Sequence, residues 1–137
     1  MADVSITAAN VVADEGFGYS DGIAGVAVTA GQAVYKDAND ANKFKLADAN
    51  ASLAAATAVG IALHGAAAGQ PLRVMTSGTL TIGGTVAAGL IYVVSATAGG
   101  IAPSADLTTG WYTTVLGLGI STTKISVGLT SAGVAVA

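Results

Sequence analysis

An internal repeat constrains the fold of this chain more than any other feature of its sequence. Residues 28–31 (Val-Thr-Ala-Gly) match residues 86–89 (Val-Ala-Ala-Gly), and further matches follow in the same order at an offset of 57 or 58 residues. They pair Tyr35 with Tyr92, Phe44 with Ile101, Asp48 with Asp106, and residues 59–61 with residues 116–118. Similarity at a fixed offset indicates that one structural unit is used twice. Chance matching is the alternative, since Val, Ala and Gly are common here, but the conserved order of the blocks favours duplication.

Short apolar segments separated by glycine and Asn/Asp clusters recur along the chain, about every eight to twelve residues, which is typical of an all-β domain. We expect strands near residues 26–36, 43–47, 59–64, 72–76, 79–82, 91–95, 112–120 and 124–129. Residues 48–57 are rich in alanine, which has a strong helix propensity, and Asp48 is a candidate N-cap. The predicted fold is all-β, a small barrel or sandwich of two related β-units (about 23–78 and 80–137), with at most one short helix around 48–57.

The chain carries few charges for a soluble protein. Only 9% of its residues are charged, against about 25% in typical domains, so we expect a partner to cover part of the surface. The net charge is −3 and the five basic residues are scattered, which argues against nucleic-acid binding. The absence of cysteine fits assembly in a reducing cytosol. The most apolar stretch is interrupted by glycines and a threonine, so we expect neither a signal peptide nor a membrane span.

Candidate catalytic and metal-binding residues are scarce. His64 is the only histidine and has no acidic neighbour in sequence, so no Ser-His-Asp arrangement is evident. Asp37, Asn39 and Asp40 start like a calcium-binding loop but lack its glycine and its distal glutamate. We interpret them as a turn. The sequence therefore predicts a protein that is not an enzyme and has no cofactor and no metal site.

Residues 1–22 lie outside both repeats and hold four of the eight acidic residues. We expect an extended N-terminal arm preceding a single β domain at 23–137. Chain termini are commonly mobile, so a frayed tail is one interpretation. The other is an arm that docks on the capsid or on a neighbouring molecule by adding a strand to a sheet edge. The candidate docking residues are Val4, Ile6, Phe17 and Tyr19.

Several segments resemble those of the phage capsid decoration (cement) proteins. They are residues 6–12 (ITAANVV), 30–35 (AGQAVY), 45–49 (KLADA), 59–63 (VGIAL), 67–71 (AAGQP) and 92–101 (YVVSATAGGI). The resemblance spans nearly the whole chain, and its motifs are structural and short. None of them is a catalytic signature that could be transferred to particular residues.

The resemblance implies a structural virion protein that binds the outer surface of an assembled capsid and stabilises it. The implied partners are the major capsid protein and further copies of the chain itself, as a homotrimer, with assembly in the host cytoplasm. The alternative is a head-fibre or adhesin-type module that recognises host surface glycans. In that case Trp111 and Tyr112 are the candidate residues for stacking on a sugar, although core packing is the more common use of buried aromatic rings.

Overall fold

The computed structural model describes residues 3–136, which contain ten strands, one α-helix and three short 3-10 helices. The strands are β1 (Val12–Ala13), β2 (Gly18–Ile23), β3 (Ala33–Asp37), β4 (Lys43–Leu46), β5 (Gly60–Ala62), β6 (Pro71–Thr81), β7 (Ile91–Val94), β8 (Ile101–Pro103), β9 (Tyr112–Gly119) and β10 (Lys124–Ala135). The helices are η1 (Ala8–Asn10), η2 (Ala38–Asp40), α1 (Leu53–Ala56) and η3 (Ser104–Asp106).

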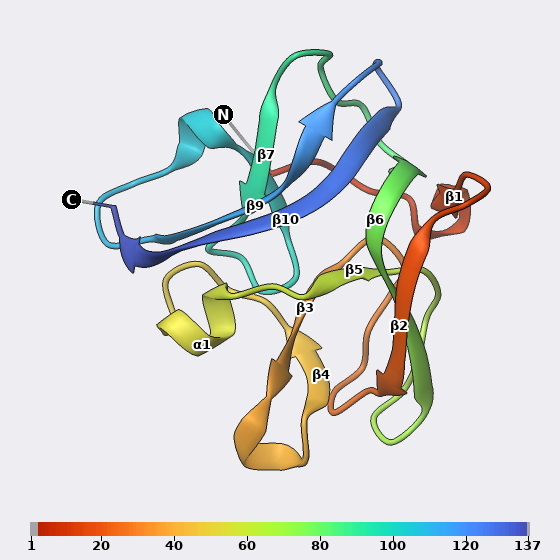
Figure 1. Ribbon diagram of the computed structural model, residues 1–137, viewed down its shortest axis with the longest axis vertical. Coiled ribbons are helices and arrows are strands. Elements are labelled where there is room, and N and C mark those ends of the chain that lie inside the picture. The colour runs from red at the N-terminus through yellow and green to blue at the C-terminus, as the bar shows by residue number, and fades with distance from the viewer. Residues whose placement is uncertain (1–2, 137) are drawn as a thin grey trace.

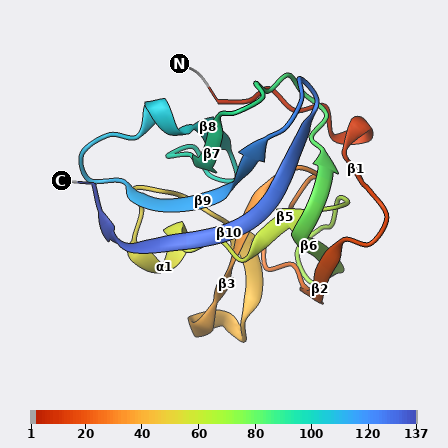
Figure 2. The same cartoon turned by 45° about the horizontal axis from the view of Figure 1, so that its top comes forward.

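The strands form one curled antiparallel sheet, in the order β4-β3-β5-β6-β10-β9-β7-β8, with β1 and β2 also paired to β6. The sheet curves into a half-barrel, from which the β3–β4 hairpin projects at one end (Figures 1 and 2). β9 and β10 form a long two-stranded ribbon that crosses the front of the molecule. The fold class predicted from the sequence, all-β with at most one short helix, is confirmed.

The first unit (β3 to β6) and the second unit (β7 to β10) have the same connectivity. In each, the first strand pairs with both the second and the third, and the third pairs with the fourth. The turns before β3 and β7 also match: the Gly31 N–H donates to the Ala62 carbonyl and the Gly89 N–H donates to the Gly119 carbonyl, both at 2.8 Å. Both glycines have a positive φ, 90° and 85°. The two units join where β6 pairs with β10.

The strand registers correct one detail of the predicted repeat. Val34 pairs with Gly60 in the first unit, and Tyr92 pairs with Gly117 in the second. Val34 is therefore the structural equivalent of Tyr92, and the predicted match of Tyr35 with Tyr92 is one residue out. The offset is 58 residues on the first strand of each unit and 57 on the returning strand, because the segment that connects these two strands is one residue longer in the first unit.

Gly78 joins two strands that the sequence separates. Strands are predicted at 72–76 and 79–82, but β6 runs without interruption from Pro71 to Thr81. Gly78 has a φ of 110°, a backbone conformation that glycine adopts without strain. An added Cβ there would lie 3.0 Å from the Phe17 Cα atom. The glycine therefore bends a long strand around Phe17 and does not form a turn.

The only α-helix in residues 3–136 is shorter than the alanine-rich segment that predicts it. α1 covers four residues, and its N-cap is Ser52, whose side chain accepts a hydrogen bond from the Ala55 N–H at 3.1 Å. Asp48, the predicted cap, instead accepts from the Asn50 N–H in the preceding turn. The helix packs beside the β9–β10 ribbon, where the buried Thr114 hydroxyl donates to the Ala56 carbonyl.

Two clusters of buried side chains hold the sheet together. The larger core cluster draws on both units, and its largest members are Ile61, Met75, Leu80, Ile82, Tyr92, Ile101, Leu116 and Ile125. The smaller core cluster lies between the first unit and the segment that precedes it, and consists of Ala24, Val28, Val34, Phe44, Ala62, Ala66, Leu72 and Val74. Apart from Phe44, it contains only aliphatic side chains.

The predicted boundary between an N-terminal arm and the β domain falls inside β2. This strand pairs with β6 from Gly18↔Ser77 to Ile23↔Pro71, and β1 pairs with the far end of β6. Residues 18–23 therefore belong to the sheet. They were not predicted as a strand because three glycine and aspartate residues interrupt their apolar pattern.

Candidate interaction surfaces

The N-terminal residues 3–7 lie along the surface of their own domain. The Val4 N–H donates to the Ile101 carbonyl and the Thr7 N–H donates to the Gly83 carbonyl, both at 2.8 Å. The Val4 and Ile6 side chains are half-buried against the larger core cluster. At the start of the segment, the Ser95 hydroxyl donates to Asp3 at 2.7 Å.

Four glycines line the surface on which this segment lies. A Cβ atom added to Gly31 would lie 2.7 Å from the Ile6 Cγ2 atom, and one added to Gly83 would lie 2.5 Å from the Thr7 carbonyl oxygen. At Gly84 it would overlap the Ser5 carbonyl, and at Gly100 it would lie 2.7 Å from the Asp3 carboxylate. We call Gly31, Gly83, Gly84 and Gly100 the glycine track. Gly83 and Gly84 admit the backbone of the segment, and Gly31 and Gly100 admit the side chains of Ile6 and Asp3, because the track itself has no side chains.

Phe17 and Tyr19 form the second pair of predicted docking residues. Their ring centroids are 5.7 Å apart with the planes inclined at 51°. Phe17 is half-buried and packs against the larger core cluster, whereas Tyr19 is 52% exposed. Three of the four predicted docking residues, Val4, Ile6 and Phe17, thus contact this chain's own core. Contact of any of the four with the capsid or a neighbouring molecule stays a prediction.

Tyr19 belongs to a polar cluster that the sequence analysis missed. The Arg73 guanidinium lies over the Tyr19 ring, 4.0 Å from its centroid. It also donates two hydrogen bonds to Asp21, from Nε at 2.7 Å and from Nη2 at 3.0 Å. These hydrogen bonds, together with the Arg73 charge, hold the pKa of Asp21 below its ordinary value. The residues come together because β2 and β6 are paired, although they are far apart in sequence.

His64 lies beside this cluster, with both ring nitrogens engaged by the backbone. Nδ1 is 2.9 Å from the Gly65 carbonyl, and Nε2 accepts the Arg73 N–H at 3.1 Å. Since a carbonyl oxygen only accepts, Nδ1 carries the proton in this arrangement. Neither nitrogen is free to take a proton from a nucleophile, which general-base catalysis requires.

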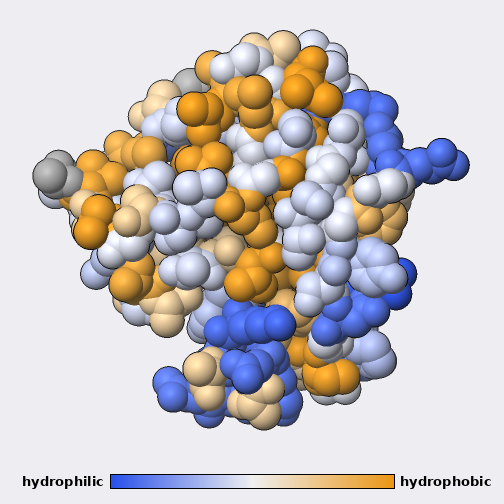
Figure 3. All heavy atoms as spheres, viewed as in Figure 1, coloured by the Kyte–Doolittle hydropathy of each residue, from blue (hydrophilic) through white to orange (hydrophobic). Residues whose placement is uncertain are grey.

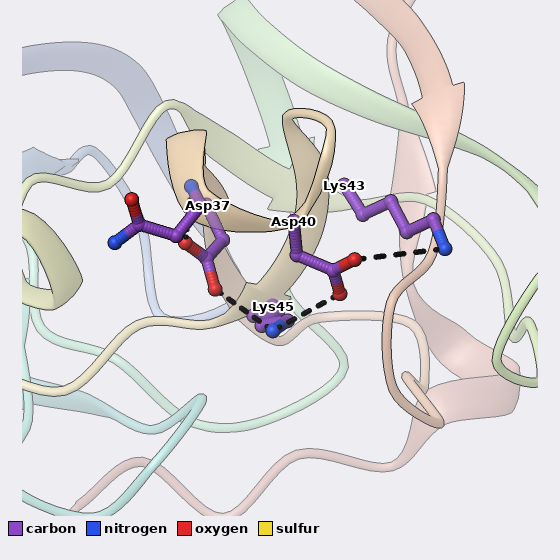
Figure 4. Close-up of polar contacts among 5 residues, drawn as sticks. Asp37, Asp40, Lys43 and Lys45 are labelled. Atoms are coloured by element: carbon purple, nitrogen blue, oxygen red, sulfur yellow. Dashed lines mark hydrogen bonds and ion pairs between the residues drawn. The ribbon is translucent and has the colours of Figure 1, made fainter.

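The residues that start like a calcium loop form the tip of the β3–β4 hairpin (Figure 4). Lys45 Nζ lies 2.8 Å from Asp37 and 3.2 Å from Asp40, and Lys43 Nζ lies 3.8 Å from Asp40. The Asp37 side chain also accepts from the Asn39 N–H at the start of η2. The carboxylates therefore interact with lysines and with the backbone. Within residues 3–136, no three His, Cys, Asp or Glu side chains are placed to share a metal ion.

Lowering the pH should destabilise this hairpin tip. The hydrogen bond from Lys45, followed by that from the Asn39 N–H, holds the pKa of Asp37 below its ordinary value of 3.8. A lowered folded-state pKa contributes stability above the unfolded-state pKa, and this contribution is lost as the pH falls through the folded-state pKa. We expect Asp37→Asn to destabilise the protein at neutral pH, and the difference from wild type to shrink below pH 3.8, as measured by urea unfolding.

Lys43→Met is the control for this prediction, because the Lys43 ammonium lies 3.8 Å from its one carboxylate partner at the tip. It should change stability little at any pH. A difference between wild type and Asp37→Asn that stays constant from neutral to acidic pH would contradict the assignment.

Trp111 immediately precedes β9 and Tyr112 is the first residue of that strand; both are half-buried. Trp111 packs against the larger core cluster, as the core-packing interpretation expects. Its remaining surface lines a shallow hollow that also includes Asp3, Ser95, Asp106 and Thr108. Aromatic, carboxylate and hydroxyl groups around one hollow are suited to polar ligands such as sugars.

Exposed apolar side chains gather where β7 meets β9. Ile91 and Leu118 are cross-strand partners and are 44% and 43% exposed. Leu90 and Ile120, which flank them, are 38% and 47% exposed. We call Leu90, Ile91, Leu118 and Ile120 the apolar cluster. Figure 3 shows hydrophobic atoms at the top of the molecule and elsewhere on this face, and hydrophilic atoms concentrated over the β3–β4 hairpin and along the right-hand edge.

Comparison of the chain with protein-family models, curated proteins and solved structures finds no significant match. None of the helices in residues 3–136 is long and apolar enough to cross a membrane.

Proposed function

We propose that this chain is a structural virion protein, without enzymatic activity, that binds the outer surface of an assembled phage capsid and stabilises it. Its partners are the major capsid protein and further copies of itself, in a homotrimer. The sequence resemblance to decoration proteins supports this role. So does the lack of a free base at His64, the only histidine.

The proposal rests on a contrast between two parts of the surface. Most basic side chains form ion pairs within the chain, whereas the apolar cluster is exposed to solvent. Four of the five basic side chains, those of Lys43, Lys45, Arg73 and Lys124, form ion pairs within the chain. The four side chains of the apolar cluster, by contrast, remain 38–47% exposed. Exposed apolar side chains grouped in this way mark protein interaction sites. The surface is thus suited to burial against other protein subunits.

Stabilisation follows from mass action. A protein that binds the assembled lattice and not its separated subunits lowers the free energy of the lattice by RT ln(1 + [L]/Kd). At a free concentration 100 times the dissociation constant this amounts to about 2.7 kcal/mol per site. Many sites on one shell act together, so modest affinity at each site is sufficient. No chemical step is required.

Particles that lack this protein provide the test. We expect the purified protein to cosediment with empty shells in a saturable manner and to raise their melting temperature in calorimetry. Unassembled capsid protein is the control, and it should not bind. Saturable binding to the unassembled subunits with no rise in shell melting temperature would contradict the proposal.

The alternative function is a head-fibre or adhesin-type module that recognises host surface glycans. The hollow beside Trp111 favours it, because that hollow combines an aromatic ring with carboxylates and hydroxyls. The same preparation discriminates the two functions. Binding to a glycan array that Trp111→Phe weakens, with no binding to shells, would favour the glycan-binding module.

A further inference from the structure

The turns that precede β3 and β7 have the same backbone conformation, but other parts of the described chain cover only the first of them. Gly31 and Gly89 occupy the same turn, with the same hydrogen bond to the returning strand. At Gly31, the Ile6 and Val11 side chains lie 2.7 Å and 3.1 Å from the position of an added Cβ atom. At Gly89, no atom lies within 4 Å of that position. At this turn the N-terminal segment covers the first unit, whereas no atom of residues 3–136 lies within 4 Å of the equivalent position in the second unit.

The neighbouring positions show the same difference. The register that pairs Ala33 with Ile61 in the first unit pairs Ile91 with Leu118 in the second. Ala33 and Ile61 are completely buried in the larger core cluster, against which Ile6 also packs. Their equivalents Ile91 and Leu118 are more than 40% exposed. The second unit therefore presents, uncovered, a surface that the first unit buries.

We infer that the apolar cluster is a docking surface for a second copy of this chain. The cluster itself contains no charged residue, so two copies that each carry a net charge of −3 can meet there without like-charge contacts. The nearest charge along the β9–β10 turn, Lys124, is paired with Asp14 at 3.0 Å. In the first unit, the equivalent residues Ala33 and Ile61 are buried against apolar side chains of the same chain. A second copy offers side chains of the same kind.

This inference rests on the self-association included in the proposed function and identifies the surface responsible. The cluster has the anatomy of an interface centre, with aliphatic side chains in the middle and polar residues such as Ser126, the cross-strand partner of Leu118, beside them. Capsid binding can use a different face. The two activities can therefore be separated by substitution.

Leu118→Lys tests the inference by sedimentation velocity over a concentration series. We expect wild type to self-associate, and Leu118→Lys to weaken self-association about 100-fold or more, because an unpaired charge would be buried in the interface. The matched control is Val134→Lys, which places the same charge at an apolar side chain that is 66% exposed on β10. It should self-associate like wild type. Circular dichroism verifies that each variant is folded.

The natural absence of cysteine permits a second measurement on a milder substitution. Ile120→Cys introduces a single thiol, whose alkylation rate should fall as protein concentration rises through the association range. The thiol of Val134→Cys should react at the same rate throughout. This readout does not depend on how a new lysine affects folding.

The outcomes distinguish the inference from the proposed function. Self-association that survives Leu118→Lys, with an Ile120→Cys thiol that stays reactive, would overturn this docking surface and leave self-association intact. A wild-type chain that remains monomeric at every concentration would overturn both the surface and the homotrimer. Shell binding by Leu118→Lys, measured by cosedimentation, reports on capsid decoration separately.

Discussion

Replacement of Phe44 by alanine should reduce the free energy of unfolding by about 3–5 kcal/mol, the range found for buried Phe→Ala changes. Phe44 is completely buried and is the only aromatic side chain in the smaller core cluster. Its ring packs so closely under β2 that a Cβ atom added to Gly22 would lie 2.5 Å from the Phe44 Cε2 atom. The surrounding alanines and valines are too short to fill the cavity. Urea unfolding followed by circular dichroism measures the loss.

Phe17→Ala is the matched control, since the chain has only two phenylalanines. Phe17 is half-buried at the surface of the larger core cluster, so its removal should cost clearly less. Equal losses for the two variants would mean that the smaller core cluster does not contribute to the cooperative core of the domain.

Gly84→Ala should detach residues 3–7 from the glycine track or cost about 1–3 kcal/mol of stability through overpacking. The φ of Gly84 lies outside the left-handed region, so alanine fits its backbone conformation. The added methyl group, however, would overlap the Ser5 carbonyl. We expect the Val4 and Thr7 amides, which are hydrogen-bonded to Ile101 and Gly83, to lose protection in hydrogen exchange.

Gly128→Ala is the control for this change, because Gly128 also has an ordinary φ and an added Cβ there meets no atom within 4 Å. Its exchange pattern and stability should stay close to those of wild type. Unchanged protection of Thr7 in Gly84→Ala would show that the N-terminal segment does not depend on the glycine track for its position.

Most of the strands could be predicted because the apolar segment that forms a strand and the glycine or Asn/Asp residues that end it are neighbours in sequence. β3, β4, β7, β9 and β10 all overlap the predicted segments, with β3 starting later and β10 ending later than expected. The repeat likewise identified equivalent strands to within one residue. β8 was not predicted because its three residues are too few to show alternation.

Contacts between distant residues could not be predicted in the same way. The ion pairs of the β3–β4 tip join residues at most eight positions apart, whereas Arg73 and Asp21 are 52 apart and meet only because β2 pairs with β6. The glycine track is similar, since Gly31, Gly83 and Gly100 come from three separate turns. From sequence these positions are indistinguishable from ordinary turn glycines. These residues can be recognised as a group only from their positions in the folded chain.

The position of β6 in the sheet has a consequence for how the chain folds during synthesis. This one strand pairs with β1 and β2, which precede it in sequence, and with β10, which follows it only after β7, β8 and β9. β7, β8 and β9 are therefore synthesised before β6 can acquire its last partner, and long-range pairing of this kind slows folding. Until Gly128 emerges, part of β6 has an unpaired edge, which invites association with other incomplete chains. Once residues 124–128 of β10 have paired with β6, this edge is covered and no longer available to other incomplete chains.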